Sequence, residues 1–125
     1  MITPAAAAQR VLVVDDEIDI REVIEMVLRM AHYDVTTVDC GQAAVAAARD
    51  GRFDLLVTDY RMPGMSGAAT IGALKALHPD MRVLVATGYF SEEIFAECRA
   101  RGADDFLRKP VELEELLRVV RALLA

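Results

Sequence analysis

Five polar side chains that could act together each lie at the end of a short apolar run: Asp15, Asp16, Asp59, Thr87 and Lys109. The adjacent carboxylates of Asp15 and Asp16 repel each other and resist losing their hydration, so a folded chain needs a reason to place them directly after VLVV. If Asp59 joins them, the cluster requires a cation. Carboxylate oxygens with room for water suit Mg²⁺, and three carboxylates, Mg²⁺ and one lysine sum to zero formal charge. The residue types therefore indicate a Mg²⁺ site that could receive a phosphoryl group.

Whether these residues meet depends on the elements that carry them. Apolar and β-branched runs occur at residues 10–15, 34–39, 53–59, 82–87 and 104–108. Several are apolar at consecutive positions, which is typical of strands covered on both faces in a parallel sheet, although the fifth is too short for periodicity alone to establish. Helical periodicity fills the gaps, most clearly from Ile20 to Ala31 and from Leu113 to Leu124. A β-α unit repeated five times predicts a parallel sheet with helices on both faces and right-handed crossovers.

Punctuation residues agree with this division. Ser66 and Ser91 are predicted to cap the starts of helices. Gly51 and Gly102 follow helical segments and are predicted to end them in the left-handed conformation. The stretch MPGMSG, residues 62–67, predicts a tight turn before the helix that Ser66 begins.

A parallel sheet would bring the candidate residues together, because the carboxyl ends of its strands share one edge and ligands bind there. Asp15 and Asp16 would follow the first strand and Asp59 the third. Thr87 would end the fourth strand and Lys109 would follow the fifth. The sequence has no G-x-S-x-G, Walker or H-E-x-x-H motif, so the hydrolytic and nucleotide-binding chemistries of those motifs are not indicated.

Composition narrows the class of protein further. The 125 residues are 54% hydrophobic, which predicts one globular domain, here residues 10–125 after a flexible leader at residues 1–9. A net charge of −6 argues against direct nucleic-acid binding. Cys40 and Cys98 fit no metal spacing and favour a reduced, cytoplasmic chain. No apolar run is long enough for a membrane span, so no membrane partner is expected.

Four fragments in this order and spacing resemble the response-regulator receiver domain of bacterial two-component signalling: VVDDE, VTDYRMPGMSG, VATGY and FLRKP. The resemblance runs from about Arg10 to the end of the chain. It implies a flavodoxin-like, doubly wound (βα)5 fold with strand order 2-1-3-4-5, as in a chemotaxis receiver.

The resemblance also implies roles for the acidic residues. Asp59 would be the phosphoacceptor, attacking a phosphoryl group to form an acyl phosphate. Asp16 and Asp59 would bind Mg²⁺ directly together with the backbone carbonyl of Arg61. Asp15 would act mainly through a metal-bound water.

The remaining implied roles concern the transferred group and the response to it. Lys109 would contact the phosphoryl oxygens, and the Lys109–Pro110 bond would be cis. The Thr87 hydroxyl would bind the phosphoryl group and, as it moved inward, let the aromatic switch residue Phe106 rotate. That rotation would change the face made by the fourth helix, the fifth strand and the fifth helix. Arg61 and Tyr89 flank the site, where side chains tune water access.

The implied partner is a histidine kinase or phosphotransfer protein, and a homodimer through the same switch face is a second expected partner. The alternative function is a Mg²⁺-dependent phosphohydrolase with an aspartyl-phosphate intermediate. We disfavour it because Asp59 is followed by YRMPG, which is no D-x-D pattern, and no insertion could form a cap. A degenerate receiver is disfavoured because the acidic, Thr and Lys set is complete. We therefore expect a signalling module and not an enzyme.

Taken singly, each residue has a plainer interpretation. Asp15 and Asp16 could simply favour a helix start, Asp59 could form an Asx-turn, and Lys109 could be solvated. Thr87 could be an ordinary strand residue and Phe106 an ordinary core residue. Only their joint convergence at one edge would favour the functional interpretation.

Overall fold

Five strands alternate with five helices in the computed structural model, which describes residues 8–125. The strands are β1 Arg10–Val14, β2 Asp34–Val38, β3 Leu55–Thr58, β4 Arg82–Thr87 and β5 Asp105–Arg108. The helices are α1 Ile18–Met30, α2 Gly41–Asp50, α3 Gly67–Leu77, α4 Glu92–Arg101 and α5 Leu113–Leu124. The predicted leader at residues 1–9 falls mostly on residues 1–7, which lie outside the described residues.

All five strands are parallel and lie in the order β2-β1-β3-β4-β5. The predicted flavodoxin-like fold and its strand order are therefore confirmed. Among the helices of residues 8–125, none combines the length and the hydropathy that crossing a bilayer requires.

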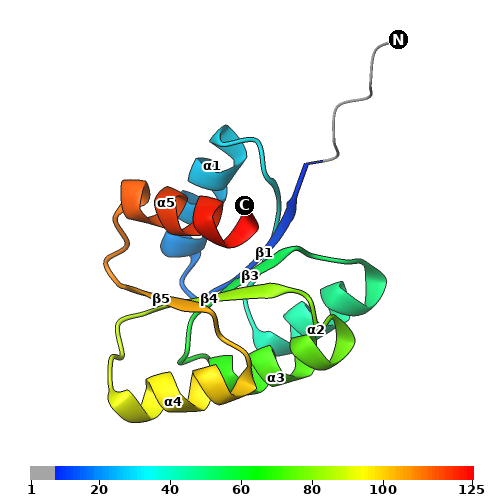
Figure 1. Ribbon diagram of the computed structural model, residues 1–125, viewed down its shortest axis with the longest axis vertical. Helices are drawn as coiled ribbons and strands as arrows, with labels where there is room; N and C mark the ends of the chain where they lie inside the picture. The colour runs from blue at the N-terminus through cyan, green and yellow to red at the C-terminus, as the bar shows by residue number, and fades with distance from the viewer. Residues whose placement is uncertain (1–7) are drawn as a thin grey trace.

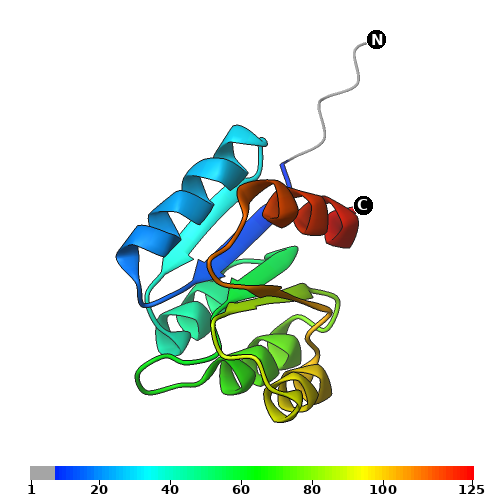
Figure 2. The ribbon, with the colours of Figure 1, turned by 90° about the vertical axis from the view of Figure 1, so that its left-hand side faces the viewer.

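Each face of the sheet buries a core of its own. Successive strand side chains point to opposite faces: Val11 and Val13 of β1 pack with α1 and α5, whereas Leu12 and Val14 pack with α2, α3 and α4. Figures 1 and 2 show α1 and α5 on one side of the sheet and the other three helices on the opposite side. Because both faces are covered, the strands can be apolar at consecutive positions.

Helix ends mostly follow the predicted punctuation. The Oγ atoms of Ser66 and Ser91 accept hydrogen bonds from the Ala69 and Ile94 N–H groups, both at 3.1 Å. Gly102 ends α4 with φ 118°, the left-handed conformation that glycine accepts readily. The prediction for Gly51 was wrong: its backbone is extended, with φ −162°, so no left-handed turn is required there.

The first three strands end one residue earlier than predicted, whereas β4 and β5 end where they were predicted to, and the early ends matter for the site. β1 ends at Val14 and β3 at Thr58, so Asp15 and Asp59 are the first residues beyond their strands. At the opposite edge of the sheet, the side-chain amide of Gln9 donates a 2.9 Å hydrogen bond to the Leu124 carbonyl. The beginning of β1 and the end of α5 therefore lie side by side.

Candidate functional site

The sheet itself fixes the backbone of the predicted site residues. The Asp15 N–H donates to the Val38 carbonyl at 3.2 Å, and the Asp59 N–H donates to the Val14 carbonyl at 3.1 Å. The Lys109 N–H donates to the Thr87 carbonyl at 3.0 Å. These bonds continue the ladders of β1, β3 and β5 by one residue. As a result, the backbone of Asp15, Asp59 and Lys109 is held at one edge of the sheet by the same kind of hydrogen bonds that hold the strands.

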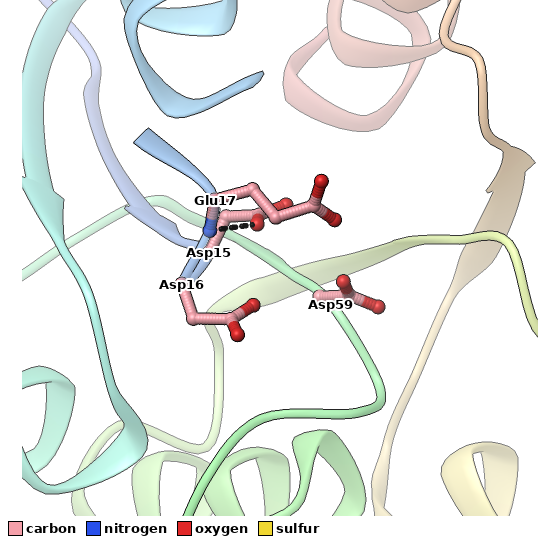
Figure 3. Close-up of side chains that lie close together, drawn as sticks. All are labelled: Asp15, Asp16, Glu17 and Asp59. Atoms are coloured by element: carbon pink, nitrogen blue, oxygen red, sulfur yellow. Dashed lines mark hydrogen bonds between the residues drawn. The ribbon is translucent and has the colours of Figure 1, made fainter. Parts of the chain in front are cut away.

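Four carboxylates gather at this edge. Asp15, Asp16, Glu17 and Asp59 can each offer an oxygen atom, and these oxygens lie within 4.8 Å of one another. Figure 3 shows the four side chains around a common space, three from the segment after β1 and one from the end of β3. Asp15 and Asp59 are buried, whereas Asp16 and Glu17 are exposed. Glu17 had no predicted role, although its place as the third acid of VVDDE was a signal that could have found it.

Lys109 is the cation of the cluster. Its Nζ donates 2.7 Å hydrogen bonds to Asp15 Oδ2 and to Asp59 Oδ2. Glu17 Oε1 lies farther away, at 3.4 Å. The Lys109 side chain is only 11% exposed, against 3% for Asp15 and 5% for Asp59. Removal of three charged groups from water is tolerable here because each has a close partner of opposite charge.

Burial and hydrogen bonding shift the pKa values of Asp15 and Lys109. Burial raises the pKa of Asp15 above its ordinary value, and the hydrogen bond from Lys109 only partly offsets this. Burial alone would lower the pKa of Lys109, but its hydrogen bonds to Asp15 and Asp59 outweigh burial and raise that pKa. Lys109 is therefore a permanent cation. The cluster still holds four carboxylates against one ammonium group.

Backbone donors orient the two buried carboxylates. The Glu17 N–H donates to Asp15 Oδ1 at 2.9 Å, and the Tyr60 N–H donates to Asp59 Oδ1 at 2.6 Å. Each carboxylate thus has one oxygen on a backbone N–H and the other on Lys109. The guanidinium of Arg21, which the sequence did not single out, donates to the Asp15 carbonyl at 2.7 Å and braces the acidic segment.

The segment after Asp59 is packed tightly against α3. The Gly67 N–H donates to the Tyr60 carbonyl at 2.7 Å. A Cβ atom at Gly67 would collide with the Asp59 carbonyl oxygen and would lie 2.7 Å from the Tyr60 Cα. Glycine is therefore required where α3 begins, because the backbone beside the candidate nucleophile passes directly over it.

Thr87 and Phe106 lie where the prediction put them along the chain. Thr87 is completely buried, and its Oγ1 accepts a 3.2 Å hydrogen bond from the Tyr89 N–H. Phe106 is half-buried against the core beneath α4, and its ring centroid is 4.6 Å from that of Phe95. The Arg99 guanidinium lies 5.2 Å from the Phe106 ring. Among the described hydrogen bonds, none joins Thr87 to Asp59.

Arg61 and Tyr89 enclose the site from the side of α3 and α4. The Arg61 guanidinium lies 4.2 Å from the centre of the Tyr89 ring, within cation–π distance. Tyr89 lines two adjoining grooves, one with Asp16 and Arg61 and the other with Asp59 and Lys109. Tyr89 therefore borders both grooves that open beside the acidic cluster.

The donor set fits Mg²⁺. This ion takes oxygen ligands, keeps several waters, and is held by one or two carboxylates together with phosphate oxygens. Here two buried and two exposed carboxylates converge, the grooves beside them are open, and one lysine leaves most of the negative charge uncompensated. The Lys109–Pro110 bond is cis, as the resemblance implied.

Comparison with known families agrees with this geometry. Residues 11–121 match the model of the response regulator receiver domain. The probable transcriptional regulatory protein TcrX of Mycobacterium tuberculosis is 39% identical over 114 residues, which cover 91% of this chain and 49% of TcrX. The chain belongs to the response regulator receiver domain family, and it spans about half, or less, of the length of curated relatives such as TcrX.

Solved structures show the same likeness. The chemotaxis protein CheY4 of Vibrio cholerae superposes with a TM-score of 0.90 at 34% identity, over 94% of this chain and 99% of that one. The receiver domain of the sensor histidine kinase PA1611 of Pseudomonas aeruginosa has a TM-score of 0.84 at 29% identity, over 94% of this chain and 98% of that one. That structure has a magnesium ion coordinated in the active site cleft.

Proposed function

We propose that this chain is a phosphorylatable receiver domain of a two-component response regulator, which accepts a phosphoryl group on Asp59 in a Mg²⁺-dependent reaction. The observation that carries the proposal is the bridge of Lys109 Nζ between Asp15 and Asp59, at 2.7 Å from each, beside two further carboxylates. A buried carboxylate with a cation beside it and an open groove in front of it is arranged to attack phosphorus.

Asp59 acts as the nucleophile. One carboxylate oxygen forms a bond to the phosphorus of a phosphohistidine on a histidine kinase or phosphotransfer protein, while the phosphorus–nitrogen bond breaks. The leaving imidazole keeps the bonding electron pair and takes up a proton. Lys109 transfers its hydrogen bonding from Asp59 Oδ2 to the phosphoryl oxygens and neutralises their charge.

Asp16, Asp59 and the backbone carbonyl of Arg61 are the protein ligands that we assign to Mg²⁺, with Asp15 acting through a metal-bound water. Held there, Mg²⁺ would supply positive charge beside the phosphoryl oxygens. Asp16 and Arg61 line one groove beside the site, which supports this assignment. Glu17 adds a fourth carboxylate at the exposed rim.

Phosphorylation is read out by Thr87 and Phe106. The Thr87 hydroxyl exchanges its hydrogen bond with the Tyr89 N–H for one with the phosphoryl group, and Phe106 turns into the space that is vacated. Such a modification shifts a population only by its different interactions with the two states. The altered surface is the face made by α4, β5 and α5, which is also where we place a homodimer contact.

A Mg²⁺-dependent phosphohydrolase remains the competing function. Both functions use an aspartate nucleophile, and they differ in whether small phosphate esters are turned over continuously. Membership of the receiver family and the open grooves around Asp59 favour a signalling module over an enzyme. The proposed histidine kinase partner and two free cysteines, of which Cys98 is buried, support a cytoplasmic location for the module.

Intact-mass measurement tests the proposal. Acetyl phosphate with Mg²⁺ should add one phosphoryl group to the chain, and chelator should prevent it. Asp59→Asn should abolish the addition without loss of the fold. An unchanged mass with several phosphodonors would refute the proposal, and steady hydrolysis of small phosphate esters would favour the phosphohydrolase.

A further inference from the structure

Helix α4 is held to the domain by little buried surface. Among its ten residues, all of which are described, Cys98 alone is fully buried. By contrast, α3 buries five of its eleven residues. A helix with few buried contacts can shift at low free-energy cost. Individual contacts at the surface of α4 therefore have an unusually large share in fixing its position.

One of these contacts leads directly to the candidate nucleophile. The Tyr60 hydroxyl donates a 2.7 Å hydrogen bond to Glu97 Oε2 on α4. The N–H of the same tyrosine donates to Asp59 Oδ1 at 2.6 Å, and its carbonyl accepts from the Gly67 N–H at 2.7 Å. Tyr60 thus contacts the carboxylate of Asp59 through its backbone and α4 through its side chain.

We propose that Tyr60 and Glu97 form a tether that transmits the state of Asp59 to α4, separately from Thr87 and Phe106. The inference rests on the proposed function, because it assumes that Asp59 accepts a phosphoryl group. In this role Tyr60 is a positioning residue: it acts on α4 through Glu97 and takes no part in the bond changes at phosphorus.

The chemistry at Asp59 supplies the signal. As a free carboxylate, Asp59 accepts a charge-assisted hydrogen bond from the Tyr60 N–H. An acyl phosphate has lost the carboxylate charge, so the remaining carbonyl oxygen accepts a weaker, neutral hydrogen bond. The backbone of Tyr60 is then less firmly held. Any shift of Tyr60 reaches α4 through its side chain, because the Tyr60 hydroxyl is hydrogen-bonded to Glu97.

The second attachment of α4 shows why the tether is a separate route. Phe95 packs on Phe106 with 4.6 Å between ring centroids, which links α4 to β5. Glu97 instead links α4 to the end of β3 through Tyr60. Coupling between sites is reciprocal. If phosphorylation of Asp59 changes the affinity of a partner that displaces Glu97, binding of that partner must change the phosphorylation equilibrium of Asp59 by the same factor.

Hydrogen exchange with beryllofluoride as the phosphoryl mimic tests the tether. The variants are Tyr60→Phe, which removes only the hydroxyl, and Glu97→Ala. Glu97→Gln keeps an acceptor and should restore most of the effect. Glu93→Ala is the control, since it removes one charge from the same helix and Glu93 has no ion pair within the described residues. Amide exchange of residues 92–101 is measured with Mg²⁺, with and without beryllofluoride.

For Tyr60→Phe and Glu97→Ala, the factor by which the mimic changes the α4 exchange rates should be about two- to fivefold smaller than in wild type, as the loss of one hydrogen bond allows. The double variant should add little to either single change. Ratios equal to those of wild type and Glu93→Ala would overturn the tether alone, provided that wild type binds beryllofluoride. If wild type takes up neither beryllofluoride nor a phosphoryl group, the proposed function fails and the tether fails with it.

Discussion

At the scale of single residues, Lys109 links stability to chemistry. Its Nζ is the charge partner of both buried carboxylates, and in the proposed reaction the same atom must turn to the phosphoryl oxygens. Asp15 and Asp59 therefore lose part of their compensation at the moment when phosphate arrives. The Mg²⁺ ion that we propose to bind in the same cluster would compensate the carboxylate charge in place of Lys109.

Lys109→Met tests this dual role, because methionine keeps the aliphatic chain and removes the charge. Without Mg²⁺, we expect a loss of about 3 kcal/mol in the free energy of unfolding, since two buried carboxylates lose their partner. Phosphorylation by acetyl phosphate should slow on the order of a hundredfold. Urea unfolding in chelator and time-resolved intact mass measure the two effects. Lys109→Arg, which keeps the charge, should lose less stability, and equal stability of Lys109→Met and wild type would contradict the interpretation.

The raised pKa of Asp15 predicts how Mg²⁺ binding depends on pH. A proton on Asp15 competes with the ion, so affinity should decline as pH falls towards the pKa of this carboxyl. Because burial raises that pKa, the decline should begin at a higher pH than the ordinary value of 3.8 would produce. Below the pKa, affinity should fall by up to about tenfold per pH unit. Calorimetric titration of Mg²⁺ at several pH values measures this, and Asp15→Asn should lose most of the dependence.

At the scale of elements, the junction of β3 with α3 delivers Asp59 to the site. Strand ends and helix starts were predictable because hydrophobic periodicity and caps are local signals, as Ser66 and Ser91 illustrate. The close approach of Gly67 to the Asp59 carbonyl was not predictable, since it depends on how two elements meet in space. The Tyr60–Glu97 contact was missed for the same reason: its residues are 37 positions apart.

Two glycines of α3 provide a matched test of this junction. Gly67→Ala should destabilise the domain by about 1–3 kcal/mol, because its Cβ meets backbone that cannot yield without moving Asp59. Phosphorylation should slow as well. Gly72→Ala should instead stabilise it by about 0.5–1 kcal/mol, because alanine is the better helix former and only the flexible end of Arg101 must move. Equal effects of the two changes on urea unfolding would refute the close-approach argument.

At the scale of the whole molecule, two well-packed cores support an edge that is electrostatically unfavourable by itself. The fold was predictable because five β-α units admit few arrangements, and the resemblance supplied the strand order. The convergence of Asp15, Asp59 and Lys109 followed from that order. For Glu17 the sequence offered only its place as the third acid of VVDDE, and its inclusion as a fourth carboxylate depends on the conformation of the loop after β1.

Asp59→Asn should make the domain more stable than wild type without Mg²⁺ and less stable than wild type with saturating Mg²⁺. In chelator the variant should be more stable than wild type by about 1 kcal/mol, since one of four clustered negative charges is gone while an oxygen remains for Lys109. Saturating Mg²⁺ should stabilise wild type by about 2.7 kcal/mol at one hundred times the dissociation constant, and the variant by less. Thermal unfolding of both proteins, in chelator and in saturating Mg²⁺, measures this change in their order of stability. Lower stability of the variant in chelator would show that the Lys109 bond outweighs charge repulsion.

The hydrogen bond between Gln9 and the Leu124 carbonyl has a consequence for the connectivity of the chain. A short glycine-rich peptide joining these two points would close the polypeptide into a ring without disturbing either core. The ring could then be cut open in the loop between α2 and β3, which lies at the opposite edge of the sheet from the carboxylates. Such a circular permutant should assemble the same acidic edge, because its side chains are placed by strand order in space and not by the order in which they are synthesised.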